Sequence, residues 1–144
     1  MSQKAETIFS KLLHSKMSPS IYIEKTNNPF RKGTPDFFYE SKGPILWAEH
    51  KHILAPWTTD KAPSEICKST SWPAQRRWLV RAHNNNQQAL VIIGIGSGRN
   101  TQGYILTFPF NFEVQYNLAF SLEHIAKYIE NKVTNETTVF NIQG

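Results

Sequence analysis

Residues 89–95, with the sequence ALVIIGI, form a continuous apolar run of strand length. Because the run shows no polar alternation, it predicts a strand that is covered on both of its faces. Such a strand fits a central sheet with helices packed against it, as in the α/β class. At 144 residues the chain has the size of one domain with a core of its own.

Three stretches have the spacing of amphipathic helices. Apolar side chains recur every three or four residues over 3–14 and again over 121–133. A third helix is expected to begin at Pro73, which the first turn of a helix tolerates, and to end near Asn84. Residues 54–73 show no sustained period and are expected to form a long surface loop.

Short runs rich in β-branched and aromatic residues predict the remaining strands. A turn signal around Gly43 joins two of them into an antiparallel hairpin. The expected order is one helix, three strands, one helix, two strands and one helix, which makes a mixed central sheet flanked by helices. In addition to 89–95, strands are expected at 21–25, 35–40, 44–53 and 104–108.

Composition and charge restrict the class of protein further. No stretch approaches the roughly 18 to 20 apolar residues of a membrane span, and the N-terminal residues lack the apolar core of a secretory signal. The single cysteine, Cys67, cannot form an internal disulfide, which fits the cytoplasm of a bacterium or a phage-infected cell. The formal net charge of +5 fits a polyanionic partner, and it fits equally a merely cationic surface.

Charged residues inside the predicted hairpin indicate a candidate site. Side chains alternate along a strand, so Glu49 and Lys51 point to one side together. Asp36 begins the partner strand, and closing the hairpin brings it close to Glu49. Two such carboxylates suit a hard cation such as Mg²⁺, and an ammonium beside them suits a phosphodiester substrate. The alternative is an exposed ion pair of little energetic value.

The same residues belong to a longer pattern. The sequence G-T-P-D at 33–36 is followed by E-H-K at 49–51, by the helix start P-A-Q-R-R-W-L and by the apolar strand. This pattern resembles the PD-(D/E)XK nuclease superfamily and, within it, the compact VRR-NUC type of phage, bacterial and Fanconi-associated nucleases. The resemblance covers roughly residues 3–95, and it implies a restriction-endonuclease-like core in a single domain, 1–144, with 96–144 as a C-terminal strand and helix extension.

The resemblance also implies roles for individual residues. Asp36 and Glu49 match the metal-binding acids, with the main-chain carbonyl of His50 as a further ligand for Mg²⁺ or Mn²⁺. Lys51 matches the catalytic lysine, and Gln75 matches the helix glutamine of the VRR-NUC branch.

Glu6, on the first predicted helix, matches the acid that many members add to the metal site. It lies at the border of the apolar face that contains Phe9 and Leu13, so its side chain can turn inward. An exposed Glu6 that stabilises the first helical turn through the helix dipole fits the sequence as well.

The implied activity is that of a divalent-metal-dependent DNA endonuclease that hydrolyses phosphodiester bonds and acts as a homodimer or a higher homo-oligomer. Resemblance to the phage-type members, which include junction resolvases, favours branched DNA as the substrate. A sequence-specific homing or restriction-type endonuclease is one alternative. A non-catalytic DNA-binding module on the same fold is another.

Basic residues flank the candidate site on both sides. Phosphate contacts need cations without demanding exact spacing, so these residues are expected to bind the DNA backbone. The three arginines of the predicted helix that begins at Pro73 also fit a solvated helix face. The candidate DNA-binding residues are Lys25, Arg31, Lys32, Lys61, Lys68, Arg76, Arg77, Arg81 and Arg99.

Overall fold

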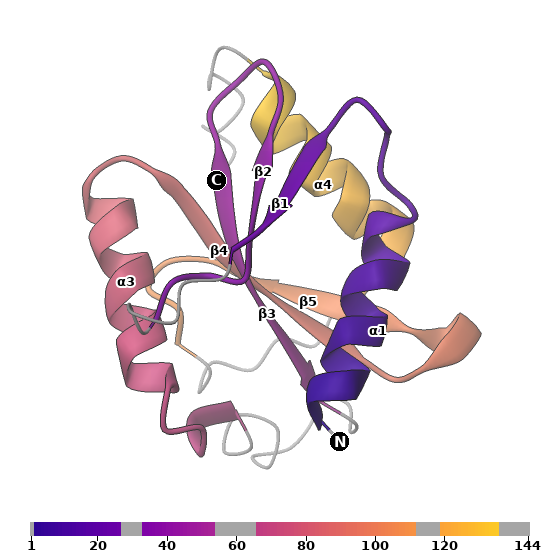
Figure 1. Ribbon diagram of the computed structural model, residues 1–144, viewed down its shortest axis with the longest axis horizontal. Helices are drawn as coiled ribbons and strands as arrows, with labels where there is room; N and C mark the ends of the chain where they lie inside the picture. The colour runs from indigo at the N-terminus through magenta and orange to yellow at the C-terminus, as the bar shows by residue number, and fades with distance from the viewer. Residues whose placement is uncertain (1, 27–32, 54–65, 112–118, 136–144) are drawn as a thin grey trace.

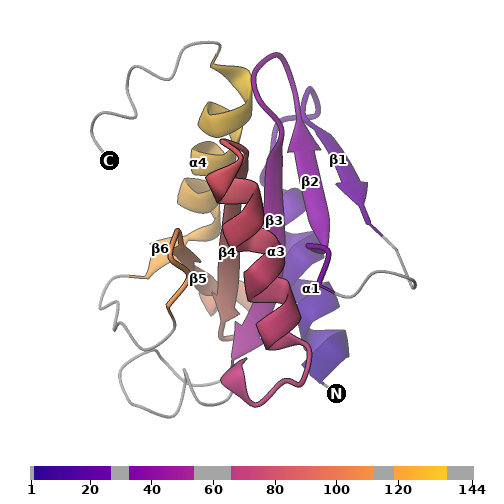
Figure 2. The ribbon, with the colours of Figure 1, turned by 90° about the vertical axis from the view of Figure 1, so that its left-hand side faces the viewer.

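The computed structural model describes residues 2–26, 33–53, 66–111 and 119–135. Within these residues, six strands form one sheet with helices against both of its faces (Figure 1). The strands lie side by side in chain order from β1 to β6 (Figure 2). Their bounds are β1 (Tyr22–Lys25), β2 (Phe37–Glu40), β3 (Leu46–Ile53), β4 (Gln88–Ile95), β5 (Gln102–Leu106) and β6 (Phe120–Ser121).

The sheet is mixed, and most of its pairs are antiparallel. Strands β2 and β3 form the expected antiparallel hairpin, and β3 pairs in parallel with β4. A parallel pair of consecutive strands needs a crossover connection, and α3 (Trp72–Asn84) lies within it. The predicted mixed sheet flanked by helices is therefore confirmed. The two-residue strand β6 was not predicted, because so short a segment has no readable pattern.

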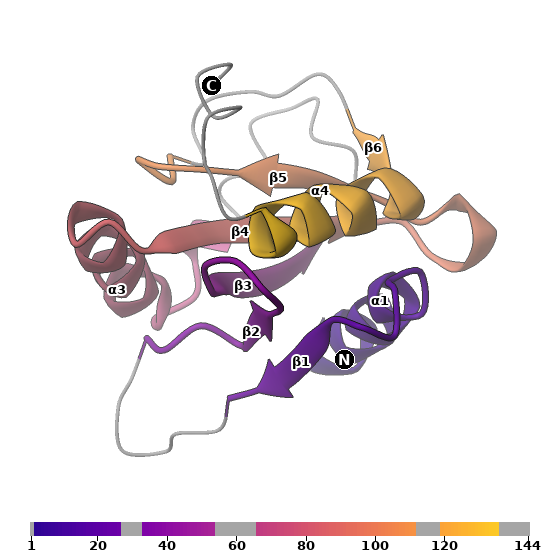
Figure 3. The ribbon, with the colours of Figure 1, turned by 90° about the horizontal axis from the view of Figure 1, so that it is seen from above.

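Helices α1 (Ser2–His14) and α4 (Leu122–Thr134) cover one face of the sheet, and α3 covers the other (Figure 3). Alternate residues of β4 face the two layers. Ile92 belongs to the core cluster beneath α1 and α4, whereas Val91 and Ile93 belong to the cluster beneath α3. The prediction that this strand is covered on both faces is confirmed.

The C-terminal elements complete the sheet and one of its two cores. Strand β5 pairs with β4, and α4 buries Ile125 and Ile129 in the cluster that it shares with α1. The side chain of Ser121 caps α4 by accepting a hydrogen bond from the backbone N–H of His124 at 3.1 Å. None of the described helices is long and apolar enough to cross a membrane.

Gly94 in β4 allows the close approach of α1. A Cβ at this position would lie 2.4 Å from the ring of Phe9, so Gly94→Ala must displace that ring or the helix that carries it. We expect this substitution to lower the free energy of unfolding by about 1–3 kcal/mol, measured by urea denaturation. The smaller ring-free side chain of Phe9→Leu should relieve the clash, so the two substitutions together should cost less than the sum of their separate costs. Fully additive costs would contradict this account of Gly94.

Candidate active site

The hairpin brings Asp36 next to Glu49. The β2–β3 register pairs Phe37 with Ala48. Asp36, which directly precedes β2, therefore lies beside Glu49, which follows Ala48 in β3. Asp36 Oδ2 accepts a hydrogen bond from the backbone N–H of His50 at 3.0 Å. The side chains of Asp36 and Glu49 are close enough to share a hydrogen bond. The two acids predicted from the sequence therefore meet at one end of the hairpin.

Lys51 lies on the same side of β3 as Glu49, as strand alternation predicts. Its Nζ is 3.5 Å from Glu49 Oε2 and donates a hydrogen bond to Gln75 Oε1 at 2.7 Å. The ammonium also lies 5.8 Å from the ring centre of Trp72. An acid, an amide oxygen and an aromatic face thus hold the Lys51 side chain, which is only 12% exposed.

Gly33 explains how the segment before Asp36 comes close to α3. Its φ of +93° is in the left-handed region, and an added Cβ would lie 2.6 Å from the carbonyl oxygen of Ala74. Only glycine fits this approach without strain. The contact places the chain that leads into Asp36 against the helical turn that carries Gln75.

The three candidate acids are electrostatically coupled. Burial, followed by the charge of Asp36, raises the pKa of Glu49 well above its ordinary value, and Lys51 only partly opposes this. Burial also raises the pKa of Asp36, against the effect of its hydrogen bond from His50. The pKa of Glu6 rises to about 7, mainly through burial and then through Asp36. Glu6 therefore turns inward toward the other two acids, and the alternative of an exposed first-turn residue is disfavoured.

Glu49 retains an unsatisfied oxygen. Within the described residues its Oε1 atom is buried and has no hydrogen-bond partner, which is costly for a polar atom unless a ligand satisfies it. The described side chains include no group of three or more His, Cys, Asp or Glu placed to hold a metal ion. Mg²⁺, however, commonly binds through one or two carboxylates together with water and substrate phosphate. The pair of Asp36 and Glu49 fits a cation of this kind.

A second set of polar residues lies on the other side of β3 and was not predicted as a group. Ser10 Oγ is 2.7 Å from His50 Nδ1, and His50 Nε2 is 3.0 Å from the hydroxyl of Tyr39. The Tyr39 hydroxyl is also 2.8 Å from His14 Nε2. The sequence contains one signal for this chain of contacts, because Glu6, Ser10 and His14 are spaced four residues apart on a single helix.

The candidate DNA-binding residues fall into two groups. Arg31, Lys32 and Lys61 lie outside the described residues. The six others are exposed, and Lys25, at the end of β1, is close enough to influence the pKa values of Glu6 and Asp36. These six are Lys25, Lys68, Arg76, Arg77, Arg81 and Arg99.

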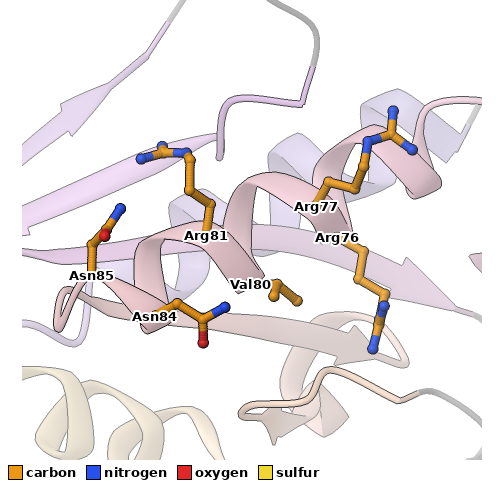
Figure 4. A pocket seen from close by; sticks show the side chains of 6 residues that line it. All are labelled: Arg76, Arg77, Val80, Arg81, Asn84 and Asn85. Carbon is orange, nitrogen blue, oxygen red and sulfur yellow. The ribbon is translucent and has the colours of Figure 1, made fainter.

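The arginines of α3 gather around an open pocket of about 400 Å³ on the outer side of the helix. Arg77 and Arg81 project from one side of α3, and Arg76 projects from the other (Figure 4). Arg81 lies 4.9 Å from the ring centre of Trp78, which anchors its guanidinium. The remaining lining residues are Val80, Asn84 and Asn85.

Comparison of the chain with protein-family models, with curated proteins and with solved structures finds no match. The resemblance to PD-(D/E)XK nucleases therefore stays a prediction. Because fold alone does not fix function, the functional argument depends on the geometry and electrostatics of the site itself.

The raised pKa of Glu6 makes folding stability depend on pH. In the folded state its pKa is about 7, against an ordinary value of 4.5, so the folded chain holds a proton that the unfolded chain releases. The stability from this proton is complete below pH 4.5 and is lost as the pH rises through 7. With a chelator present, the wild type should therefore lose stability relative to Glu6→Gln between about pH 5 and pH 8, measured by urea unfolding.

The stability of the wild type must be compared with that of Glu6→Gln, because His14 also makes folding stability depend on pH. Burial lowers the pKa of His14 from 6.5 to about 4, so its own contribution to stability falls as the pH drops through that range. The effect of His14 is present in both proteins and cancels in the difference between them. Equal pH profiles for the wild type and Glu6→Gln would show that Glu6 is not buried among the acids.

Proposed function

We propose that the chain is a divalent-metal-dependent DNA endonuclease with a restriction-endonuclease-like core. The observation that carries the proposal is the pair of buried Glu49 and half-buried Asp36, with an unsatisfied Glu49 oxygen and with the Lys51 ammonium 3.5 Å from the Glu49 carboxyl group. Buried carboxyl groups in contact are costly, and a cation relieves that cost. A cation with an adjacent ammonium is suited to the charge of a phosphodiester.

Each residue has a role in this proposal. Asp36, Glu49 and the main-chain carbonyl of His50 would hold Mg²⁺ or Mn²⁺. The bound ion would supply an activated water and would neutralise charge on the phosphate. Lys51 would stabilise negative charge on the phosphoryl oxygens. Gln75 accepts a hydrogen bond from Lys51 at 2.7 Å and would position the Lys51 ammonium.

Glu6 has a supporting role. Its electrostatic coupling to Asp36 and Glu49 adds negative charge next to the cation, which strengthens the attraction for a divalent ion. The described acids do not form a cage of three side chains. The proposed site is therefore open, and the substrate phosphate completes it.

The charge distribution on α3 supports DNA as the partner. The helix carries three arginines and no acidic residue, and its first turns hold Gln75 against Lys51. Its outer face, where the open pocket lies, is a cationic surface on the helix whose inner side contacts Lys51 through Gln75. Such a surface fits the phosphate backbone of DNA. Branched DNA is the substrate that this proposal favours, and a homodimer stays a prediction.

A cleavage assay tests the proposed activity. Purified protein with Mg²⁺ or Mn²⁺ should cut DNA, and Lys51→Ala should slow cleavage by roughly 10²-fold or more, because it removes charge stabilisation from the transition state. Asp36→Ala should abolish cleavage. Lys127→Ala is the matched control, because Lys127 is an exposed lysine on α4, across the sheet from α3.

The substrate panel decides among the alternatives. It contains linear duplex, single-stranded, flap and four-way-junction DNA, together with long genomic DNA. Cuts confined to branch points support the proposed substrate, and discrete cuts only in long duplex favour a site-specific endonuclease. Tight binding without cleavage in either metal would contradict the proposed activity and favour a non-catalytic DNA-binding module.

Binding without cleavage isolates the contribution of α3. In a Lys51→Ala background with a chelator, the substitutions Arg77→Gln and Arg81→Gln together should lower the slope of log binding constant against log salt by about 2, because each phosphate contact contributes about 0.9. The matched control pair, Lys11→Gln with Lys127→Gln, removes two exposed charges from α1 and α4. Fluorescence anisotropy measures both slopes. An equal reduction in the two pairs would contradict a role for α3 beyond net charge.

A further inference from the structure

One face of α1 carries a stripe of polar side chains. Glu6, Ser10 and His14 follow one another at intervals of four residues, which places them on the same side of the helix. Glu6 couples to the candidate acids, Ser10 contacts His50, and His14 contacts Tyr39. The helix therefore meets the sheet through Ser10 and His14 as well as through Phe9 and Leu13.

The contacts form one continuous chain from α1 through the sheet and back to α1. The order is Ser10, His50, Tyr39 and His14, with separations of 2.7, 3.0 and 2.8 Å. Burial lowers the pKa of both His14 and His50, so both imidazoles are neutral near pH 7. Each neutral ring can donate at one nitrogen and accept at the other, so all three contacts can form with the donors running in either direction along the chain.

Packing of the core between α1 and the sheet does not require a polar side chain at position 50. His50 is 1% exposed and lies among rings, with its centroid 4.6 Å from that of Phe37 and 5.8 Å from that of Phe9. An apolar side chain in the same place would avoid the cost of burying an imidazole. Hydrogen bonds, unlike apolar contacts, fix the distance and the rotation between two elements, and a satisfied buried network makes one arrangement unique.

His50 connects this chain to the candidate acids. Its side chain points toward α1, while its own backbone N–H donates to Asp36 Oδ2 at 3.0 Å. Ser10 lies one helical turn from Glu6, whose carboxyl group is coupled to Asp36 and Glu49. The hydrogen-bonded row of side chains is thus connected to the acid cluster at two points. One is the helix that carries Glu6, and the other is the His50 peptide.

We propose that Ser10, Tyr39 and His14 are positioning residues, which hold α1 and the His50 peptide so that Glu6 and Asp36 stay directed at one cation site. None of the three needs to touch the cation or the substrate. The inference depends on the proposed function in one respect, that the acid cluster binds a divalent cation.

Metal binding, measured without DNA, tests this inference. Isothermal titration calorimetry with Mn²⁺ should show about tenfold weaker binding for Ser10→Ala and for Tyr39→Phe, as is common when a residue that orients a metal ligand is removed. Ile129→Val is the packing control, because Ile129 is fully buried in α4 within the same core. It should lower stability without changing Mn²⁺ affinity.

A double-mutant cycle separates positioning from general loosening of the core. If Ser10 acts through Glu6, Ser10→Ala should weaken Mn²⁺ binding in the wild type and have little further effect in Glu6→Gln. Circular dichroism and urea unfolding of each variant confirm that it is folded. Should Tyr39→Phe fail to fold, the cycle with Ser10 still decides the question.

The outcomes are distinguishable. Ser10→Ala and Tyr39→Phe proteins that are destabilised like Ile129→Val but bind Mn²⁺ with wild-type affinity would overturn the positioning role and leave the proposed nuclease intact. Wild-type protein that binds no Mn²⁺ would overturn the metal site itself, and the inference with it. Weaker binding by the two variants that disappears in the Glu6→Gln background supports the inference.

Discussion

The burial of Glu49 is the constraint around which the rest of the site is built. Its side chain is 3% exposed on a strand whose neighbours are mainly apolar, where an uncompensated carboxylate is costly. Lys51 supplies partial compensation, whereas the nearby charge of Asp36 adds to the cost, and each of the two depends on another element for its position. Gln75 on α3 holds Lys51, and the register of the hairpin places Asp36. Sheet, helix and acids therefore form one structural unit.

The strand pattern predicted this side of the site well, because alternation along a strand is a local property. Placing Glu49 and Lys51 on one side needs only a period of two, and placing Asp36 beside them needs only a turn near Gly43. The polar chain from Ser10 to His14 could not be predicted in the same way. Its members come from α1, β2 and β3, and the contacts exist only once the helix has docked on the sheet.

Helical periodicity predicted α3 but did not predict the role of its arginines. A period of 3.6 separates a buried face from an exposed one, and the structure buries Leu79 and exposes Arg76, Arg77 and Arg81. What the period cannot give is where the exposed face lies relative to other elements. The contact between Gln75 and Lys51 fixes the start of the helix at the candidate site, while the arginines line a pocket on its outer side. The DNA-binding role of the three arginines therefore stays a prediction.

The two sides of β3 share a single backbone, so the proposed cation binding would be linked to folding. Glu49 and Lys51 face the α3 side, while the His50 ring faces α1 and its N–H reaches Asp36. In an unfolded chain the acids are far apart in sequence and have no common site. A cation that binds them together therefore binds the folded chain alone and stabilises it by mass action. The acid cluster, which weakens the fold through its raised pKa values, would then be the same feature that ties the fold to the proposed cation.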